Sequence, residues 1–378
     1  MIDQLQALVI GDAMIPEYVF TQAWEKHLAS YGSAQSGNWE PDDKQLQYRR
    51  LEVEKAGPEQ ETVEQLPLIQ KAGGQANVLL GLFLPVSSKV MDALPQLRII
   101  GVCRSGYDNV NVAEATKRGI LVFRTLGRNS QAVSDFTVGL ILSEARNIAR
   151  AHHVIKTGDW TKKFHNHGFV PELGGKNIGL IGFGYIGRLV AQKLSGFDVN
   201  VLVADPYVSQ DDMPANCRKV ELDELLSKSD FISIHVKDTR ETKGLIGKVE
   251  FAKMKPTAYL INTGRAAVVD QDALLHALKS GQIMGAALDV FDVEPIANNS
   301  PFLDLDNVTL TTHIAGTTAD VLDNSPGLLM ADIAKLLEGK EPQFIVNPEV
   351  LENPEFRKWL DTISANSASQ DSADASES

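Results

Sequence analysis

Short apolar runs alternate with amphipathic stretches along the first 125 residues of the chain. The strand-like runs are residues 5–10, 78–84, 98–103 and 120–123. Between these runs, helix-like stretches occur at residues 17–31, 87–94 and 112–118. Strands that alternate with helices are typical of parallel βαβ units. The polar segment 32–43 contains glycine and serine, and we expect it to be a surface loop.

A second alternating series begins at residue 176 and predicts a doubly wound Rossmann sheet. Helical stretches such as 185–194, 223–226 and 270–278 separate most of its strand-like runs, which are residues 178–181, 199–204, 231–236, 259–261, 286–290 and 308–310. Between the two series, residues 129–156 form either one long helix or two helices broken near Glu144. Residues 318–338 predict a further helix, with a kink or break at Pro326.

Composition and charge narrow the class of protein. The 378 residues carry a formal charge of −13, which argues against a nucleic-acid partner because such proteins need clustered basic surface. Two cysteines, Cys103 and Cys217, suggest no disulfide framework and fit a reducing compartment. The sequence has no apolar run of membrane-spanning length and no secretory signal at its start, so we expect a cytoplasmic protein without a membrane partner. We expect the tail, 366–378, to be disordered, because none of its apolar residues is larger than alanine.

A glycine-rich motif, Gly182-Phe183-Gly184-Tyr185-Ile186-Gly187, joins the first strand and helix of the second series. In such a turn Gly182 permits the tight bend, Gly184 lets the backbone approach a pyrophosphate, and Gly187 lets helix and strand pack closely. The start of the helix then offers free N–H groups and the positive end of its dipole to phosphates. The plainer interpretation is a tight turn without a ligand.

Asp205 favours the dinucleotide interpretation, because it follows the next strand, where a carboxylate can accept hydrogen bonds from the adenosine ribose. A carboxylate there would repel a 2′-phosphate, and Pro206-Tyr207-Val208 supplies no cation to offset it. The sequence therefore predicts NAD rather than NADP as the cofactor.

Three later segments each end a strand-like run with a reactive side chain. They are Asn262-Thr263-Gly264-Arg265, the stretch from Asp289 to Glu294-Pro295, and His313-Ile314-Ala315-Gly316. Ligands of open α/β sheets bind outside the carboxyl ends of the strands, so these segments can converge on the nicotinamide. Taken singly, each residue also has an ordinary structural interpretation, as a surface cation, a turn carboxylate or a loop histidine.

In combination these motifs, with Ser105-Gly106-Tyr107-Asp108-Asn109-Val110, resemble the D-isomer-specific 2-hydroxyacid dehydrogenase family, in its phosphoglycerate dehydrogenase-like branch. The resemblance covers about residues 80–345. It implies hydride transfer between NAD(H) and a small D-2-hydroxy acid or 2-keto acid of the glyoxylate, hydroxypyruvate or 3-phosphoglycerate type. It also implies an α/β fold in which a Rossmann doubly wound parallel sheet is inserted into a smaller flavodoxin-like α/β substrate domain.

The resemblance also implies the roles of individual residues. Arg265 would bind the substrate carboxylate, His313 would be the general acid and base, and Glu294 would hold its ring. The backbone at Ser105-Gly106 would bind the carboxylate from the other domain, with Arg104 beside it. The cofactor would contact Gly182, Gly184, Tyr185, Ile186, Gly187, Asp205, Val236, Thr263, Gly264, Arg265, Asp289, His313 and Gly316.

The family's architecture predicts a substrate domain of residues 1–126 and 319–350 and an NAD-binding domain of residues 127–318. Residues 129–156 resemble the arm through which members dimerise, so we expect a homodimer.

An NAD(H)-sensing, corepressor-like binding protein on the same fold is the alternative. Formate dehydrogenase is disfavoured because Ile296-Ala297-Asn298 lacks the expected glutamine. Ser87-Ser88 stands where members that use phosphorylated acids tend to carry arginine. We expect no metal at His152-His153 or His165-Asn166-His167, because no carboxylate or cysteine follows at ligand spacing.

Overall fold

The computed structural model describes residues 4–39, 42–59, 69 and 74–374, and it divides into two compact units. The outer unit comprises Met1–Arg128 and Thr318–Ser378, and the inserted unit is Asn129–Thr317. The sequence placed these boundaries at 126/127 and 318/319. Each unit has its own parallel sheet and its own buried apolar core.

The outer unit is built on five parallel strands in the order β2-β1-β3-β4-β5. The strands are β1 (Leu5–Gly11), β2 (Gly32–Asn38), β3 (Val78–Gly81), β4 (Ile99–Val102) and β5 (Leu121–Arg124). This order is that of the flavodoxin-like folds, so the predicted fold of this unit is confirmed. All residues of β3 and β4 are buried, which explains why these strands are continuous apolar runs in the sequence.

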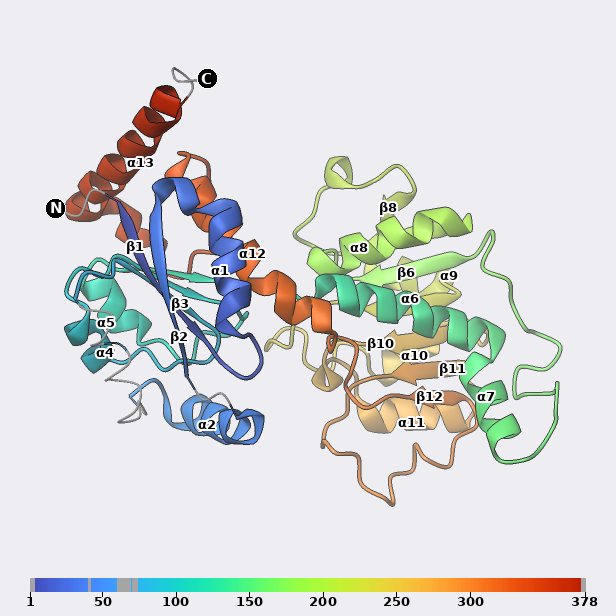
Figure 1. The fold of residues 1–378 in the computed structure, drawn as a ribbon. Helices are drawn as coiled ribbons and strands as arrows, with labels where there is room; N and C mark the ends of the chain where they lie inside the picture. Colours follow the sequence, from blue (N-terminus) through green and yellow to red (C-terminus); the bar gives the residue numbers. More distant parts are fainter. Residues whose placement is uncertain (1–3, 40–41, 60–68, 70–73, 375–378) are drawn as a thin grey trace. The chain divides into compact units, whose positions relative to one another are not determined.

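Helices cover both faces of this sheet. Figure 1 shows α4 and α5 together on one face, while α12 returns from the end of the inserted unit to pack against α1. The outer-unit helices are α1 (Glu17–His27), η1 (Ala29–Tyr31), α2 (Asp43–Ala56), α4 (Ser88–Ala93), α5 (Val112–Lys117), α12 (Ala319–Leu337), η5 (Pro348–Glu352) and α13 (Pro354–Asp374). Helix α12 runs on through Pro326, so the predicted break does not occur.

The prediction of a surface loop at 32–43 is wrong, because its first seven residues form β2. This strand pairs in parallel with β1, from Leu5↔Gly32 to Gly11↔Asn38. A Cβ at Gly32 would lie 2.0 Å from the carbonyl oxygen of Leu5, so only glycine allows the two chains to come so close there. Because β2 lies at the edge of the sheet, most of its side chains are exposed. The alternation of apolar and polar residues that would predict a strand is therefore missing from its sequence.

The inserted unit has seven parallel strands in the order β12-β11-β10-β9-β6-β7-β8. They are β6 (Asn177–Ile181), β7 (Asn200–Ala204), β8 (Cys217–Lys219), β9 (Phe231–Ile234), β10 (Tyr259–Asn262), β11 (Gly285–Leu288) and β12 (Val308–Leu310). The chain reverses direction across the sheet between β6 and β9, which is the topological switch point of a doubly wound Rossmann fold. The predicted Rossmann sheet is thus confirmed, with β8 as an additional short edge strand.

Helices also cover both faces of the inserted sheet, with α6 and α8 on one side and α9, α10 and α11 on the other. The helices are α6 (Ser130–Arg146), α7 (Ile148–Lys156), α8 (Tyr185–Leu194), η2 (Ser195–Phe197), η3 (Gln210–Asp212), α9 (Leu222–Lys228), α10 (Lys248–Lys253), η4 (Ala266–Val268) and α11 (Gln271–Lys279). Of the two alternatives for residues 129–156, two helices is the observed one. The break falls at Asn147, in the left-handed region at φ 57°, and not at Glu144.

Two predictions remain predictions. Of the tail 366–378, residues 375–378 lie outside the described residues, and only the helical backbone of α13 is described from 366 to 374. The role of the outer unit as a substrate domain rests on the family resemblance. Within the part of the chain that the structure describes, no helix is long and apolar enough to span a membrane.

Candidate active site

The glycine motif forms the turn between β6 and α8, at the carboxyl edge of the inserted sheet. Gly182 has φ +95°, and a Cβ there would lie 2.9 Å from the carbonyl carbon of His235. A Cβ at Gly187 would lie 2.4 Å from the carbonyl oxygen of Gly182, so the helix can begin here only without a side chain. By contrast, a Cβ at Gly184 would meet nothing within 4 Å, which leaves open space beside the backbone.

Gly184 is also the N-cap of α8, and no side chain caps the first turn of this helix. Backbone N–H groups at an uncapped helix start, next to open space, suit a pyrophosphate. Tyr185 is about half exposed at this start, and Ile186 packs partly buried against the core. The residues present therefore fit the phosphates of a dinucleotide.

Asp205 follows β7 and reaches back to the same turn. Its Oδ2 accepts a hydrogen bond from the N–H of Phe183 at 2.7 Å, and its Oδ1 accepts one from Tyr207 N–H at 2.8 Å. Each carboxylate oxygen has a second lone pair, which can accept from a ribose hydroxyl. Val236 adjoins the turn at the switch point, its Cγ1 lying 2.9 Å from the position of a Gly182 Cβ.

His313 and Glu294 form a close pair at the same edge of the sheet. Glu294 Oε2 lies 2.7 Å from His313 Nδ1, and Glu294 Oε1 accepts a hydrogen bond from Phe291 N–H at 2.9 Å. Partial burial raises the pKa of Glu294, but these hydrogen bonds and the charges of His313 and Arg265 outweigh it, so the pKa is lowered overall. The contact engages Nδ1 of the half-exposed His313 ring and leaves Nε2 to exchange a proton with a substrate.

Asp289 holds the loop that carries His313. Its buried carboxylate accepts hydrogen bonds from Thr311 Oγ1 at 2.7 Å, Ile314 N–H at 3.0 Å and Ala315 N–H at 2.9 Å. His313 itself has φ +57°, a left-handed conformation that costs energy for a residue with a side chain. Asp289, predicted to lie near the nicotinamide, thus fixes the backbone on the C-terminal side of His313.

The segment after β10 folds around the buried side chain of Asn262. Its Oδ1 accepts from Gly264 N–H at 3.0 Å, and its Nδ2 donates to the carbonyl of Arg265 at 3.0 Å. The Arg265 guanidinium donates from Nη1 to the Gly264 carbonyl at 2.8 Å, and Thr263 Oγ1 lies 2.8 Å from Thr137 Oγ1. Asn262 is thus a further residue of this site, and an asparagine that ends a strand before Thr-Gly-Arg is the sequence signal for this turn.

Two further groups adjoin these segments. A Cβ at Gly316 would lie 2.8 Å from Asn129 Nδ2, so a larger residue would displace the Asn129 side chain at the N-cap of α6. The ring of His235 follows β9, and its Nε2 is buried without a hydrogen-bond partner among the described residues. Burial lowers the pKa of His235 to about 4, so this ring is neutral near pH 7.

Arg104, Ser105 and Gly106 belong to the outer unit, where they follow β4. Ser105 Oγ donates to the Thr125 carbonyl at 3.3 Å, and Arg104 Cζ lies 4.8 Å from the centroid of the Phe83 ring. A Cβ at Gly106 would lie 3.2 Å from Arg104 Nη2, which brings the guanidinium to this loop. The structure therefore gathers the predicted substrate residues of this unit at the carboxyl edge of its sheet.

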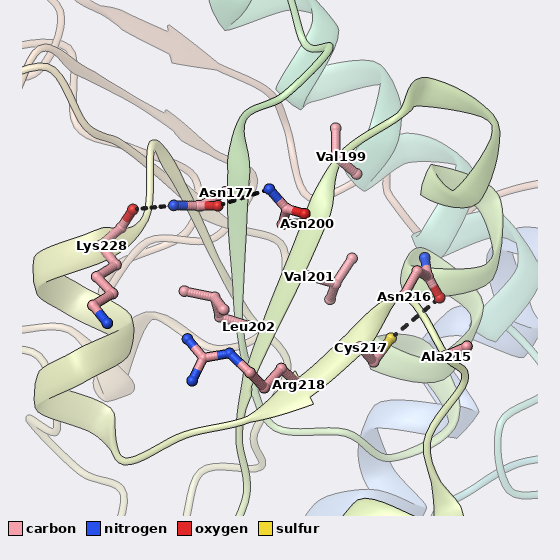
Figure 2. Close-up of a pocket in the computed structure, with 10 residues that line it drawn as sticks. All are labelled: Asn177, Val199, Asn200, Val201, Leu202, Ala215, Asn216, Cys217, Arg218 and Lys228. Atoms are coloured by element: carbon pink, nitrogen blue, oxygen red, sulfur yellow. Dashed lines mark hydrogen bonds between the residues drawn. The ribbon is translucent and has the colours of Figure 1, made fainter.

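A pocket of 320 Å³ lies elsewhere in the inserted unit, at the amino-terminal ends of β6, β7 and β8. Figure 2 shows Asn177, Asn200, Asn216 and Cys217 among its lining residues. None of the predicted site residues lines it, because they follow the carboxyl ends of the strands. Within the described ranges, no group of three or more His, Cys, Asp or Glu side chains is placed to hold a metal ion.

The strand order, the glycine turn at its switch point and the acid after β7 together define a Rossmann dinucleotide-binding protein. Residues 138–315 match the family model described as D-isomer specific 2-hydroxyacid dehydrogenase, NAD binding domain. The chain belongs to the D-isomer-specific 2-hydroxyacid dehydrogenase family, and NAD is the cofactor of this domain.

Relatives and solved structures agree with this assignment. A glyoxylate reductase from Thermofilum pendens is 46% identical over 269 residues, which cover 70% of this chain and 79% of that protein. A D-3-phosphoglycerate dehydrogenase from Archaeoglobus fulgidus is 38% identical over 273 residues, which cover 72% of this chain and 51% of that protein. The NAD complex of a D-isomer specific 2-hydroxyacid dehydrogenase from Lactobacillus delbrueckii shares the fold, with a TM-score of 0.70 and 21% sequence identity. The match covers 90% of this chain and 100% of that chain.

Proposed function

We propose that this protein is an NAD-dependent dehydrogenase that interconverts a small D-2-hydroxy acid and the corresponding 2-oxo acid. The observation that carries the proposal is the 2.7 Å contact between His313 and Glu294, in loops that follow strands of the same sheet as the dinucleotide turn. The glycine turn and Asp205 would hold NAD, which would supply the hydride acceptor for C-2 of the hydroxy acid and, as NADH, the hydride donor for the 2-oxo acid.

The residues of the inserted unit supply the remaining chemistry. During oxidation, Nε2 of neutral His313 takes the hydroxyl proton as the carbonyl forms, and during reduction the protonated ring returns it. Glu294 stabilises the protonated ring and fixes its orientation. Arg265 binds the substrate carboxylate with its guanidinium. Asp289 and Asn262 are positioning residues, because their side chains hold the backbone around His313 and Arg265.

The outer unit is the substrate domain in this proposal. The backbone N–H groups at Ser105 and Gly106 bind the substrate carboxylate, with Arg104 beside them. Glyoxylate, hydroxypyruvate and 3-phosphohydroxypyruvate are the candidate 2-oxo acids, because relatives named for glyoxylate, glyoxylate/hydroxypyruvate and 3-phosphoglycerate match most of this chain.

A substrate screen tests the proposal. NADH oxidation is followed by absorbance with glyoxylate, hydroxypyruvate, pyruvate, branched 2-oxo acids and 3-phosphohydroxypyruvate. Turnover of at least one is expected. NADH binding without turnover of any would contradict the proposal and favour an NAD(H)-sensing binding protein. The names of the relatives, which are reductases and dehydrogenases, favour the enzyme.

We also propose that the protein is a homodimer and is located in the cytoplasm. Large apolar side chains are exposed on α7 and on the segment after it: Ile148, Ile155, Trp160 and Phe169 are 56%, 55%, 76% and 57% exposed. Exposed apolar side chains of this size support burial against a second copy of the chain. The cytoplasmic location is supported by Cys103 and Cys217, which are free and buried.

A further inference from the structure

Two threonine hydroxyls join helix α6 to the end of strand β10 in the interior of the inserted unit. Thr137, in the middle of α6, is fully buried, and Thr263, the residue that follows β10, is 7% exposed. Their Oγ1 atoms lie 2.8 Å apart. Thr263 is followed by Gly264 and Arg265, so the hydroxyl pair connects α6 to the turn that carries the Arg265 guanidinium.

The direction of this hydrogen bond follows from the other contact of Thr137. A threonine hydroxyl carries one proton and can also accept hydrogen bonds. Thr137 Oγ1 donates its proton to the carbonyl of Val133, one turn earlier in α6, at 2.8 Å. Only its lone pairs then remain for Thr263, whose hydroxyl is the donor of the pair. Thr137 thus supplies the acceptor, and Thr263 supplies the proton.

The turn after β10 is fixed by further contacts on two other sides. Inside the turn, Asn262 Oδ1 accepts from Gly264 N–H and Asn262 Nδ2 donates to the carbonyl of Arg265, both at 3.0 Å. On the side of β9, a Cβ at Gly264 would lie 3.2 Å from the carbonyl oxygen of Ile234. The Thr263 hydroxyl adds the contact toward α6, so the backbone that leads into Arg265 is held on three sides.

Packing alone does not require two hydroxyls at this place. The neighbouring buried residues of α6 include Val133, Leu140 and Ile141, and a pair of valines would have nearly the shape of the two threonines. Replacing both partners of a buried hydrogen bond by apolar groups of the same shape is nearly neutral for stability, whereas removing one partner leaves the other unsatisfied. What the hydroxyl pair adds is a directional contact, which fixes the position of the turn relative to α6.

We propose that Thr137 is a positioning residue for substrate binding: its hydroxyl holds Thr263, and the turn in turn fixes the Arg265 guanidinium. The inference rests on the proposed function, in which Arg265 binds the carboxylate of the 2-oxo acid. A guanidinium binds a carboxylate best when two parallel N–H groups meet its two oxygens, so a small displacement of the turn weakens the contact. The affinity for the 2-oxo acid therefore depends on a helix residue that follows none of the strands that carry the site.

A double-mutant cycle tests the contact. The wild type is compared with Thr137→Val, Thr263→Val and the double variant, each with the 2-oxo acid that the wild type reduces fastest. Thr137→Val keeps the shape of the side chain but leaves the Thr263 hydroxyl without its acceptor. As a result kcat/KM for the 2-oxo acid should fall about tenfold, mainly through KM. In the Thr263→Val background the same substitution should change kcat/KM by less than about twofold, because the bond is already absent.

Two further variants separate positioning from a general loss of stability. Thr137→Ser keeps both hydrogen bonds, so kcat/KM should stay within about twofold of the wild-type value. Ser143→Ala is the matched control in the same helix, because Ser143 is buried and its Oγ accepts from Ala149 N–H at 3.3 Å, at the junction with α7. It should lower the denaturation midpoint without raising KM. If Thr137→Val does not fold, Thr137→Ala takes its place, since alanine has the higher helix propensity.

Two kinetic results would overturn the inference. One is a Thr137→Val protein whose KM rises no more than that of Ser143→Ala. The other is an equal loss of kcat/KM in both backgrounds, which would mean that Thr137 does not act through Thr263. A wild type that reduces no 2-oxo acid would contradict the proposed function instead. Chemical denaturation then still tests the bond: the midpoint should fall in Thr137→Val and recover in the double variant, and a midpoint that does not recover would overturn the inference.

Discussion

The carboxylate of Glu294 lies 2.7 Å from Nδ1 of His313, so a negative charge stands against one ring nitrogen and Nε2 is left outside this contact. In the proposed function Glu294 stabilises the protonated ring, and Nε2 is the acid and base. The two residues are 19 positions apart and lie in different loops, so the sheet and the Asp289 hydrogen bonds must position one against the other.

Replacement of His313 tests the proton transfer. His313→Gln should lower turnover by roughly a hundredfold to ten-thousandfold, the usual contribution of general acid–base catalysis. NADH affinity, measured by fluorescence titration, should stay near the wild-type value because the glycine turn and Asp205 are unchanged. Near-normal turnover would show that another group moves the proton.

Replacement of Glu294 tests the orientation and charge of the same ring. In Glu294→Gln the His313 ring loses the carboxylate that lies 2.7 Å from Nδ1, so kcat for reduction should fall by roughly tenfold to a hundredfold. Steady-state kinetics measures this, and NADH affinity should stay near the wild-type value. An unchanged kcat would show that the contact does not contribute to proton transfer.

Replacement of Asp205 tests the choice of NAD over NADP. Asp205→Ala should reduce the preference for NADH, measured as the ratio of kcat/KM for NADH and NADPH, by about tenfold or more. Asp205→Asn is the matched comparison, because its amide oxygen keeps one acceptor, for the N–H of either Phe183 or Tyr207, while the charge is removed. If both variants retain the wild-type ratio, another group sets the preference.

Much of this organisation is predictable from the sequence, because its signals are local. The buried strands β3, β4 and β6 are continuous apolar runs, and Arg265 and Glu294-Pro295 lie in motifs a few residues long. The edge strands β2 and β8 were missed, since both are polar and gain their stability from backbone pairing with one neighbour. Their pairing partners are distant in sequence, so no local pattern reveals them. The placement of Asp289 near the nicotinamide stays a prediction, and the structure adds that its carboxylate accepts hydrogen bonds from the backbone of the His313 loop.

Asp12 gives the outer unit a measurable dependence of stability on pH. Burial raises its pKa from 3.8 to about 6, so the folded state binds a proton more tightly than the unfolded state. Its stabilising contribution is complete below pH 3.8 and is lost as pH rises through about 6. The free energy of unfolding of the wild type, relative to Asp12→Asn, should fall by on the order of 3 kcal/mol between acid and neutral pH. Chemical denaturation at several pH values measures this, and a difference that does not change with pH would contradict it.

The exposed apolar face of α7 predicts the outcome of one surface substitution. Ile155, 55% exposed, should be buried against a second copy of the chain, so Ile155→Asp should convert a dimer into monomers. Val249→Asp is the matched control, because Val249 is an apolar residue of α10 with 63% exposure and lies outside this face. Sedimentation velocity over a range of concentrations measures the mass of each variant. A monomeric wild type, or equal dissociation in both variants, would show that α7 is not the dimer interface.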